Sequence, residues 1–125
     1  MSRPGFEIIL IGGRLSGREA GFVGESALFQ LQHVKVDLCF LGSCTVDTAE
    51  GVACIDADDA EVKRAMVESS RRVALTISSE TLLTKASFFI APAPAIHHLI
   101  LDSAAPTDRV DEFRKICADV KLVRL

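Results

Sequence analysis

The chain has 125 residues, of which 49% are hydrophobic and 25% charged, with a formal net charge of −3. This length fits one domain over residues 1–125, and this composition excludes an intrinsically disordered chain. A pI near 5.6 excludes a protein that binds nucleic acid through bulk positive charge. The mean hydropathy of +0.31 indicates either apolar surface that awaits a partner or a well-filled core.

The sequence predicts no membrane span and no signal peptide. The longest apolar stretch, residues 88–96, is interrupted by Pro92 and Pro94. It is far shorter than the roughly 20 residues that a span needs. The N-terminus leads into a short apolar run without a small-residue cleavage site. We therefore expect a cytoplasmic protein that does not associate with membranes.

The cysteines favour a reduced, metal-free protein. They form no C-x-x-C pair, and none stands near a histidine at the spacing of metal ligands. Buried thiols of a cytosolic protein are the expected state, with no cofactor. The four are Cys39, Cys44, Cys54 and Cys117.

Strands and helices alternate in the first half of the chain. Residues 6–11 form a continuous apolar run that ends at two glycines, which is typical of a strand buried on both faces. After a loop over residues 13–24, apolar residues at helical spacing predict a helix up to about residue 34. Val36–Leu41 is predicted to be a second strand, and the polar residues 43–55 a long loop.

The clearest helix begins after Asp56, which can cap it, and carries Asp58 and Asp59 in its first turn. We expect its charged first-turn side chains to be solvated. Its predicted inner face is Val62, Ala65, Met66 and Ser69, and its predicted end is Arg71 and Arg72.

The second half continues the alternation. Val73–Ile77 is predicted to be a third strand, followed by a short helix over residues 78–85 and a brief strand over residues 88–90. A fourth strand is predicted over residues 98–101, and a closing strand over residues 120–125. Between them, a helix begins at Pro106, with an inner face of Val110, Phe113, Ile116 and Cys117.

This alternation predicts an α/β fold of three layers, a mostly parallel sheet with helices on both faces. Ligands bind such sheets at the carboxyl ends of the strands. The loops after Ile11, Leu41, Ile77 and Leu101 are therefore the places to look for a site.

The first of these loops reads Gly12-Gly13-Arg14. Glycines allow the backbone to approach a ligand closely, and Arg14 could meet a phosphate or a carboxylate. A tight strand exit with a solvated arginine explains the same residues, because the pattern is not G-x-G-x-x-G.

The second loop, from Gly42 to Asp47, offers backbone N–H groups, hydroxyls and one carboxylate, which suits a polyol. Asp47 could accept hydrogen bonds from a ligand or serve as a general base. It could equally close an Asx-turn. Cys44 has no histidine near it in sequence, which disfavours a nucleophilic role.

Lys63 and Ser79 are further candidates. Lys63 lies outside the apolar stripe of its helix and, together with the helix dipole, would favour an anion. Ser79 follows the third strand and is either a ligand contact or part of a helix cap. His97 and His98 have no carboxylate or cysteine nearby in sequence and are expected at the surface or the edge of the core.

These motifs, in this order, resemble the C-terminal effector-sensing domain of the DeoR family of bacterial sugar-operon repressors. The resemblance runs from about residue 6 to the end of the chain. It rests on the strand that ends in Gly12-Gly13-Arg14, the Phe40-Leu41-Gly42 stretch followed by Asp47 and Gly51, and the helix after Asp56.

The resemblance implies a fold related to ribose-5-phosphate isomerase and the CoA transferases, and a ligand that is a phosphorylated sugar. In that family an N-terminal winged helix-turn-helix binds operator DNA. The ligand-binding positions that carry over are Gly12, Gly13, Arg14, Gly42, Asp47, Gly51 and Lys63.

The sequence departs from the family pattern in two places. Ser78-Ser79-Glu80-Thr81 stands where the family has an Asp-Ser-Ser-Lys-like stretch. The helix-turn-helix and the first sensor strand, with its Asp-x-Gly-Thr-Thr phosphate loop, are not in this sequence. DNA would therefore be reached only through a missing N-terminal domain or a partner.

We expect an effector-binding domain, or a remnant of one, rather than an enzyme. It should bind sugar phosphates weakly and form a homo-oligomer in which residues 6–11 or the neighbouring helix make contact. Two alternatives remain open at this point. One is a small sugar-phosphate isomerase-like enzyme with Asp47 as general base, and the other is a module that pairs with a full-length regulator.

Overall fold

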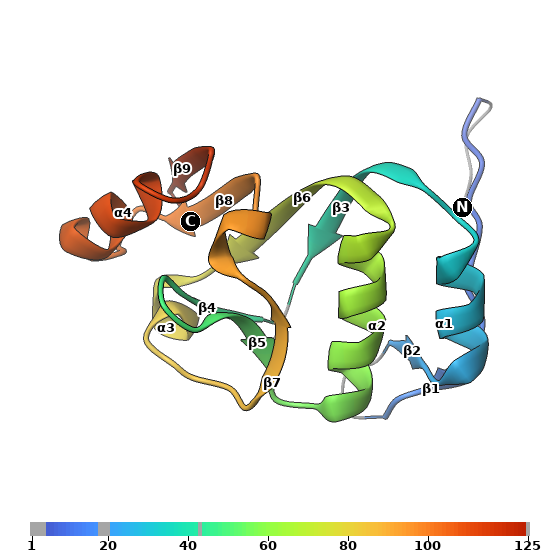
Figure 1. Ribbon diagram of the computed structural model, residues 1–125. Helices are drawn as coiled ribbons and strands as arrows, with labels where there is room; N and C mark the ends of the chain where they lie inside the picture. The colour runs from blue at the N-terminus through green and yellow to red at the C-terminus, as the bar shows by residue number, and fades with distance from the viewer. Residues whose placement is uncertain (1–4, 18–20, 43, 125) are drawn as a thin grey trace.

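A computed structural model describes residues 5–17, 21–42 and 44–124 of the chain. Its centre is a four-stranded parallel sheet in the order β3-β6-β8-β9 (Figure 1). The bounds of these strands are Val36–Leu41, Ser70–Ile77, His98–Asp102 and Asp119–Val123. The expected α/β class with a mostly parallel sheet is confirmed.

A second, antiparallel sheet joins β4 (Thr45–Asp47), β5 (Gly51–Cys54) and β7 (Phe88–Ala91). The long loop expected over residues 43–55 is therefore wrong, because Thr45 and Ala53 pair across a tight hairpin. A two-stranded hairpin, β1 (Arg14–Leu15) with β2 (Phe22–Val23), likewise replaces part of the loop expected over residues 13–24. The polar, turn-rich composition of these stretches correctly indicated turns. Their strands are too short to show a strand pattern in the sequence, so they were not predicted.

The helices are α1 (Glu25–Gln32), α2 (Ala57–Glu68), α3 (Ser79–Leu82) and α4 (Thr107–Arg114), with a 3-10 turn η1 (Ala93–Ala95) after β7. Figure 1 shows α2 between α1 on one side and the antiparallel sheet on the other, and α2 contacts both. The expected start of α2 is confirmed, since the Asp56 side chain accepts a hydrogen bond from the Asp59 N–H at 2.9 Å. The ends of two predicted helices are wrong: Arg71 and Arg72 lie in β6, and α3 stops at Leu82.

The core lies on one face of the parallel sheet. Alternate residues of the strands, such as Cys39, Val73, Leu75 and Leu99, are buried against α2, α4 and the antiparallel sheet. Val110 and Phe113 of the predicted inner face of α4 are buried, which confirms that part of the prediction. The helix ends at Arg114, so Ile116, which is partly buried, and Cys117, which is buried, lie beyond it.

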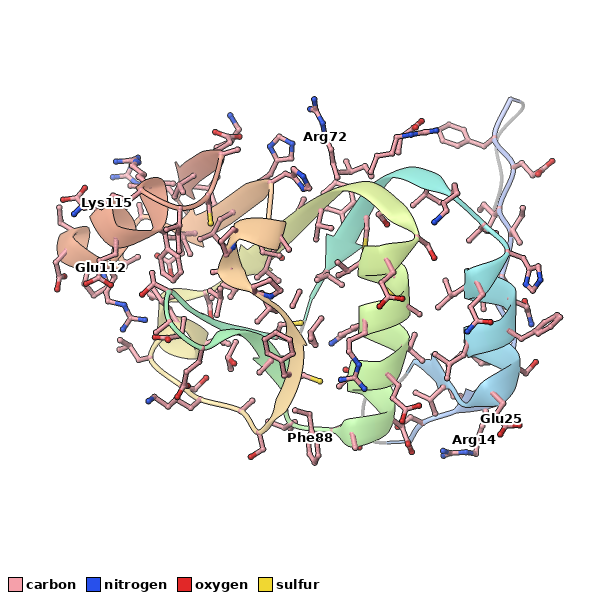
Figure 2. The ribbon with its side chains drawn as sticks, in the orientation of Figure 1. Arg14, Glu25, Arg72, Phe88, Glu112 and Lys115 are labelled. Atoms are coloured by element: carbon pink, nitrogen blue, oxygen red, sulfur yellow. The ribbon has the colours of Figure 1, made fainter. Side chains whose placement is uncertain are left out.

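The opposite face of the parallel sheet is largely exposed in this chain. Leu38 and Phe40 alternate with the core residues of β3 and are 42% and 64% exposed. Arg72, on the same face of β6, points away from α2 in Figure 2. Helices were expected on both faces, and in the described residues α2, α3 and α4 contribute buried side chains to the core on one face.

The predicted strand over residues 6–11 is wrong. These residues form neither helix nor strand, have no ladder partner among the described residues, and are mostly exposed, with Ile9 and Leu10 each 75% exposed. An apolar run becomes a strand only when a neighbouring strand supplies its hydrogen bonds.

Candidate functional site

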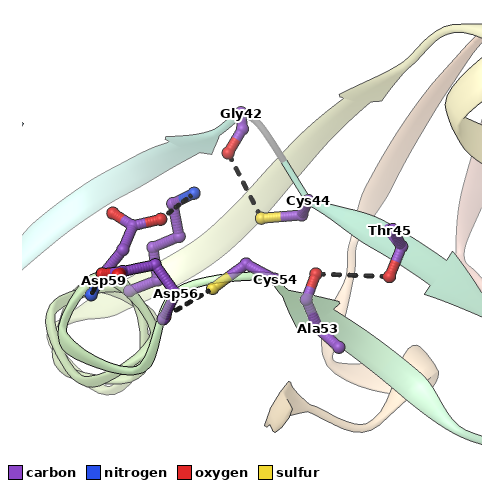
Figure 3. A network of polar contacts seen from close by, with 8 residues as sticks. Gly42, Cys44, Thr45, Ala53, Cys54, Asp56 and Asp59 are labelled. Atoms are coloured by element: carbon purple, nitrogen blue, oxygen red, sulfur yellow. Dashed lines mark hydrogen bonds and ion pairs between the residues drawn. The ribbon is translucent and has the colours of Figure 1, made fainter. Parts of the chain in front are cut away.

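The exit of β3 brings two of the predicted residues together. Gly42 follows the strand, and α2 carries Lys63 toward the same place, so that Lys63 interacts electrostatically with Cys44 just beyond Gly42. Figure 3 shows this region, with the Cys44 thiol donating to the Gly42 carbonyl at 3.2 Å and Cys54 on the next strand. The buried polar cluster, as we call it, consists of Cys44, Cys54, Asp59 and Lys63.

Lys63 is paired rather than free for a ligand. Its Nζ lies 2.7 Å from Asp59 Oδ2, and both residues are only 8% exposed. The expectation that Asp59 is a solvated first-turn charge is wrong. Asp59, Ala60 and Lys63 form the buried side of α2, whereas the predicted inner residues Val62 and Met66 are only partly buried. The spacing of four between Asp59 and Lys63 was the signal that could have revealed the pair.

Electrostatics in the cluster follow from burial and this pairing. Burial alone lowers the pKa of the Lys63 ammonium, but the Asp59 carboxylate and the nearby Cys44 outweigh it, so the pKa stands above its ordinary value. Burial raises the pKa of the Cys44 thiol to about 11, even though Lys63 opposes that shift. Cys44 is therefore a protonated, inert thiol at neutral pH, which agrees with the argument against a nucleophile.

Asp47 lies at the turn of the β4–β5 hairpin and not at the cluster. Its Oδ2 accepts the backbone N–H groups of Ala49 and Glu50 at 2.9 and 2.7 Å, which is the Asx-turn alternative. These hydrogen bonds, that of Glu50 first, hold the pKa of Asp47 below its usual range. A carboxylate of lowered pKa is a poor base near neutral pH, which disfavours the role of general base.

The turn also borders a polar cavity of about 260 Å³. Asp47 and Gly51 line it together with hydroxyl groups and the Lys85 side chain. In the sequence, residue 85 marked only the end of a predicted helix, and it was not identified as a site residue. The polar lining of the cavity consists of Thr45, Asp47, Glu50, Thr84, Lys85 and Ser87. The volume lies just below the range usual for small-molecule pockets.

Gly51 is required by packing. Its φ is +84°, and a Cβ there would lie 2.5 Å from the Ala91 carbonyl oxygen. Gly13 is similar, with a φ of +137° and a Cβ position 2.7 Å from the Val23 carbonyl oxygen. Close packing and a positive φ therefore explain why glycine stands at these two positions, without any role in ligand binding.

The remaining candidates lie elsewhere. Arg14 is exposed and pairs with Asp58 of α2 at 3.1 Å, while Gly12 donates to the Gln30 side chain at 3.3 Å. Ser79 begins α3 and donates to Asp102 Oδ2 through its N–H at 3.0 Å and its hydroxyl at 2.6 Å. Asp102, which sequence reasoning missed, thus ties the exit of β8 to the exit of β6.

His97 and His98 make structural contacts. The Val73 N–H donates to Nδ1 of His97 at 3.0 Å, and Nδ1 of His98 lies 3.1 Å from Asp119. The carboxylate partner of His98 was invisible in sequence because it lies 21 residues away. In the part of the chain that the structure describes, no group of three or more His, Cys, Asp or Glu side chains is arranged to hold a metal ion. None of its helices is long and apolar enough to cross a membrane.

The strands of the parallel sheet follow chain order, so the described strands contain no topological switch point. This explains why the predicted residues do not converge. The structure places them at three locations: Gly42 and Lys63 at the β3 exit, Asp47 and Gly51 at the polar cavity, and Ser79 at Asp102. The Gly12-Gly13-Arg14 stretch is a fourth element, joined to α2 through Asp58.

Comparison with known proteins gives a consistent set of relatives. Residues 1–103 match the model of the DeoR C terminal sensor domain. The chain is 29% identical over 123 residues to a protein of Escherichia coli O157:H7 named as an aga operon transcriptional repressor, covering 98% of this chain and 46% of that protein. It is 34% identical over 77 residues to the glycerol-3-phosphate regulon repressor of Escherichia coli (strain K12), covering 62% and 31%.

A third relative is the HTH-type transcriptional regulator GlpR of Haloferax volcanii. It is 29% identical over 106 residues, covering 85% of this chain and 42% of that protein. The chain thus spans less than half the length of these relatives.

Proposed function

The chain belongs to the family of DeoR C-terminal sensor domains, and we propose that the effector it senses is a phosphorylated sugar, bound weakly. One relative is named for the glycerol-3-phosphate regulon, which is consistent with a phosphorylated effector. The relatives are transcriptional regulators, and we propose that this chain also has no enzymatic role.

The observation that carries the proposal is the position of Lys63. Its ammonium lies beside the loop that follows β3, at the carboxyl end of a parallel strand, where ligands of α/β proteins bind. A charged amine held there suits a phosphate or another anion. Gly42 is exposed next to it and offers backbone that a ligand can approach.

The same geometry explains why binding should be weak. Asp59 neutralises Lys63 at 2.7 Å, so a phosphate must compete with a buried carboxylate for the ammonium. Arg14 is engaged with Asp58, and Asp47 is engaged with its own turn. Each charge-assisted hydrogen bond that a ligand cannot form reduces its binding free energy by about 1.5–3 kcal/mol. The loss of two or three such bonds raises a micromolar dissociation constant to about millimolar.

Calorimetric titration with a panel of hexose and pentose phosphates tests the proposal. We expect dissociation constants of about 1 mM or weaker for any member that binds, which corresponds to about 4 kcal/mol of binding free energy. Lys63→Met should abolish that binding, while Glu61→Ala, an exposed change on the same helix, should leave it intact. Micromolar affinity, or binding that survives Lys63→Met in a folded protein, would overturn the proposal.

Two further parts of the proposal concern partners. We propose that DNA is reached only through another domain or chain, since the described residues carry no helix pair of the DNA-reading kind and the net charge is −3. We also propose a homo-oligomer, supported by the exposed apolar residues of the N-terminal segment and by the exposed face of the parallel sheet. The apolar residues of the segment are Phe6, Ile8, Ile9 and Leu10.

A further inference from the structure

The polar cavity lies on the outer face of the antiparallel sheet. In the β4–β5 ladder, Val46 pairs with Val52, and both side chains are buried in the core. Because successive side chains of a strand point to opposite faces, the flanking pairs face the other way, into the cavity. These pairs are Thr45 with Ala53 and Asp47 with Gly51.

The cavity is separate from the buried polar cluster. Cys44 and Cys54 of that cluster belong to the hydrophobic core, whereas the cavity is lined from the outer face of the same sheet. Figure 1 shows the segment between α3 and β7 beside the β4–β5 hairpin, and this segment forms the other wall. Its lining residues are Thr84, Lys85, Ala86 and Ser87. A ligand confined to the cavity therefore meets no member of the buried polar cluster.

One wall of the cavity is an exposed aromatic ring. Phe89 of β7 lines the cavity and is 51% exposed. A Cβ at Gly51 would lie 3.1 Å from Cε1 of Phe89, so glycine at this position leaves that part of the ring uncovered. Ala53 adds only a methyl group beside it. An apolar wall of this kind stabilises the C–H face of a sugar ring by removing it from water.

The oxygen atoms around the ring can accept further hydrogen bonds. Asp47 receives both of its turn hydrogen bonds on Oδ2, which leaves Oδ1 as an acceptor. The Thr45 hydroxyl donates to the Ala53 carbonyl at 3.3 Å and keeps its acceptor lone pairs. The Thr84 hydroxyl does the same, since it donates to the Thr81 carbonyl at 2.6 Å. These acceptors suit the hydroxyl groups of a ligand.

The charges around the cavity balance. Lys85 Nζ lies 3.9 Å from Glu50 Oε2, beyond hydrogen-bond distance, so the ammonium can donate to a ligand. Asp47 is attracted electrostatically by Arg109 of α4 and by Lys85. Two carboxylates thus stand with two cations, and a phosphate would gain no net attraction from the four. A neutral ligand fits this environment better than an anion.

We propose that the polar cavity binds a neutral polyhydroxylated ligand, an unphosphorylated monosaccharide or sugar alcohol. Its C–H face packs on Phe89, and its hydroxyl groups bond to Asp47 Oδ1, Thr45 and Lys85. The cavity volume of about 260 Å³ suits one sugar ring rather than a chain of them. This site is additional to the proposed sugar-phosphate site and does not depend on Lys63.

Titration of the ¹⁵N-labelled chain with glucose, galactose, ribose and sorbitol, followed by amide chemical shifts, tests the site. At least one of these neutral probes should give saturable shifts with a dissociation constant of about 1–10 mM. The shifts should be concentrated at residues 45–53 and 84–89. The site is refuted if no probe gives saturable shifts up to about 100 mM, or if the shifts centre on Gly42 and Lys63.

Two variants test the lining. Ala53→Leu fills the cavity with a larger apolar side chain and should weaken binding at least about 10-fold. Ala49→Leu makes the same change on the same hairpin, at an exposed residue outside the cavity, and should leave binding unchanged. Lys85→Met removes the ammonium from an exposed side chain and should also weaken binding about 10-fold.

The amide spectrum of each variant shows whether it is folded. Unchanged binding in folded Ala53→Leu or folded Lys85→Met would overturn the proposal. An equal loss of binding in Ala49→Leu would overturn it too, because the cavity would then not be the site.

Inorganic phosphate separates this site from the proposed function. Sodium phosphate at about 50 mM, compared with sodium chloride of equal ionic strength, should leave the sugar-induced shifts at the cavity unchanged. Displacement of the sugar by phosphate would overturn a separate neutral site. Failure of phosphate or sugar phosphates to bind near Lys63 would count against the proposed function alone.

Discussion

The ammonium of Lys63 lies 2.7 Å from the carboxylate of Asp59, and the two side chains are 10% and 12% exposed. Two opposite charges are thus taken out of water one helical turn apart. Each buried charge is tolerated because the other neutralises it, so the stability of the fold depends on both side chains being present.

Replacing Lys63 by Ala should reduce the free energy of unfolding by about 3–5 kcal/mol, because it leaves the Asp59 carboxylate buried without its cation. Lys85→Ala is the matched control. Its ammonium is 3.9 Å from Glu50 and exposed, so we expect a loss of about 0–1 kcal/mol. Urea unfolding followed by circular dichroism measures both, and equal losses in the two variants would contradict the prediction.

Gly51→Ala should also destabilise the protein, by about 1–3 kcal/mol. A Cβ at Gly51 meets the Ala91 carbonyl at 2.5 Å, and the φ of +84° is unfavourable for alanine. Gly42→Ala is the control, since a Cβ there meets nothing within 4 Å. We expect its unfolding free energy to stay within about 0.5 kcal/mol of the native value, and a comparable loss at Gly42 would refute the argument from close packing.

The Asp102–Ser79 contact should make stability depend on pH. The Ser79 hydroxyl, then the Ser79 and Ala104 N–H groups, hold the pKa of Asp102 below its ordinary value. A carboxyl with a lowered folded-state pKa stabilises the fold above the unfolded-state pKa of about 3.9, and that contribution disappears as pH falls through the folded-state pKa.

We therefore expect Asp102→Asn to be less stable than the native chain at about pH 7, with the difference shrinking as the pH falls below about 4. Urea midpoints at several pH values measure it. Asp111→Asn, an exposed change on α4, provides the baseline. A difference from the native chain that does not change with pH would show that the Asp102 charge is not involved.

The four cysteines should be unreactive in the folded protein. All four are free thiols and buried, and burial raises the pKa of each. An aromatic disulfide reagent should titrate four thiols rapidly in urea and react far more slowly in buffer. Rapid modification of even one thiol in the folded protein would show that its site is open to solvent.

Local chemistry along the chain determined several elements of this fold. Val36–Leu41 is a strand with the predicted bounds, because a short, mostly apolar run that ends at a glycine has few alternatives. Asp56 caps α2 as predicted, because the contact joins residues three apart. Of the candidate site, the sequence identified Lys63 and Gly42 without placing them together.

Tertiary structure decided the rest, because the deciding contacts join residues far apart in the chain. The run over residues 6–11 has the composition of a buried strand but no neighbouring strand among the described residues, so it forms no strand and is mostly exposed. The side of α2 that is buried most deeply carries Asp59 and Lys63, since Cys44 and Cys54 lie near Lys63 and the antiparallel sheet contacts the helix. Asp102 meets Ser79 only because parallel pairing of β6 with β8 aligns their carboxyl ends. Helical periodicity and turn residues predict the secondary structure of a single segment. Whether a charged side chain or a strand edge is buried depends on which distant segment packs against it.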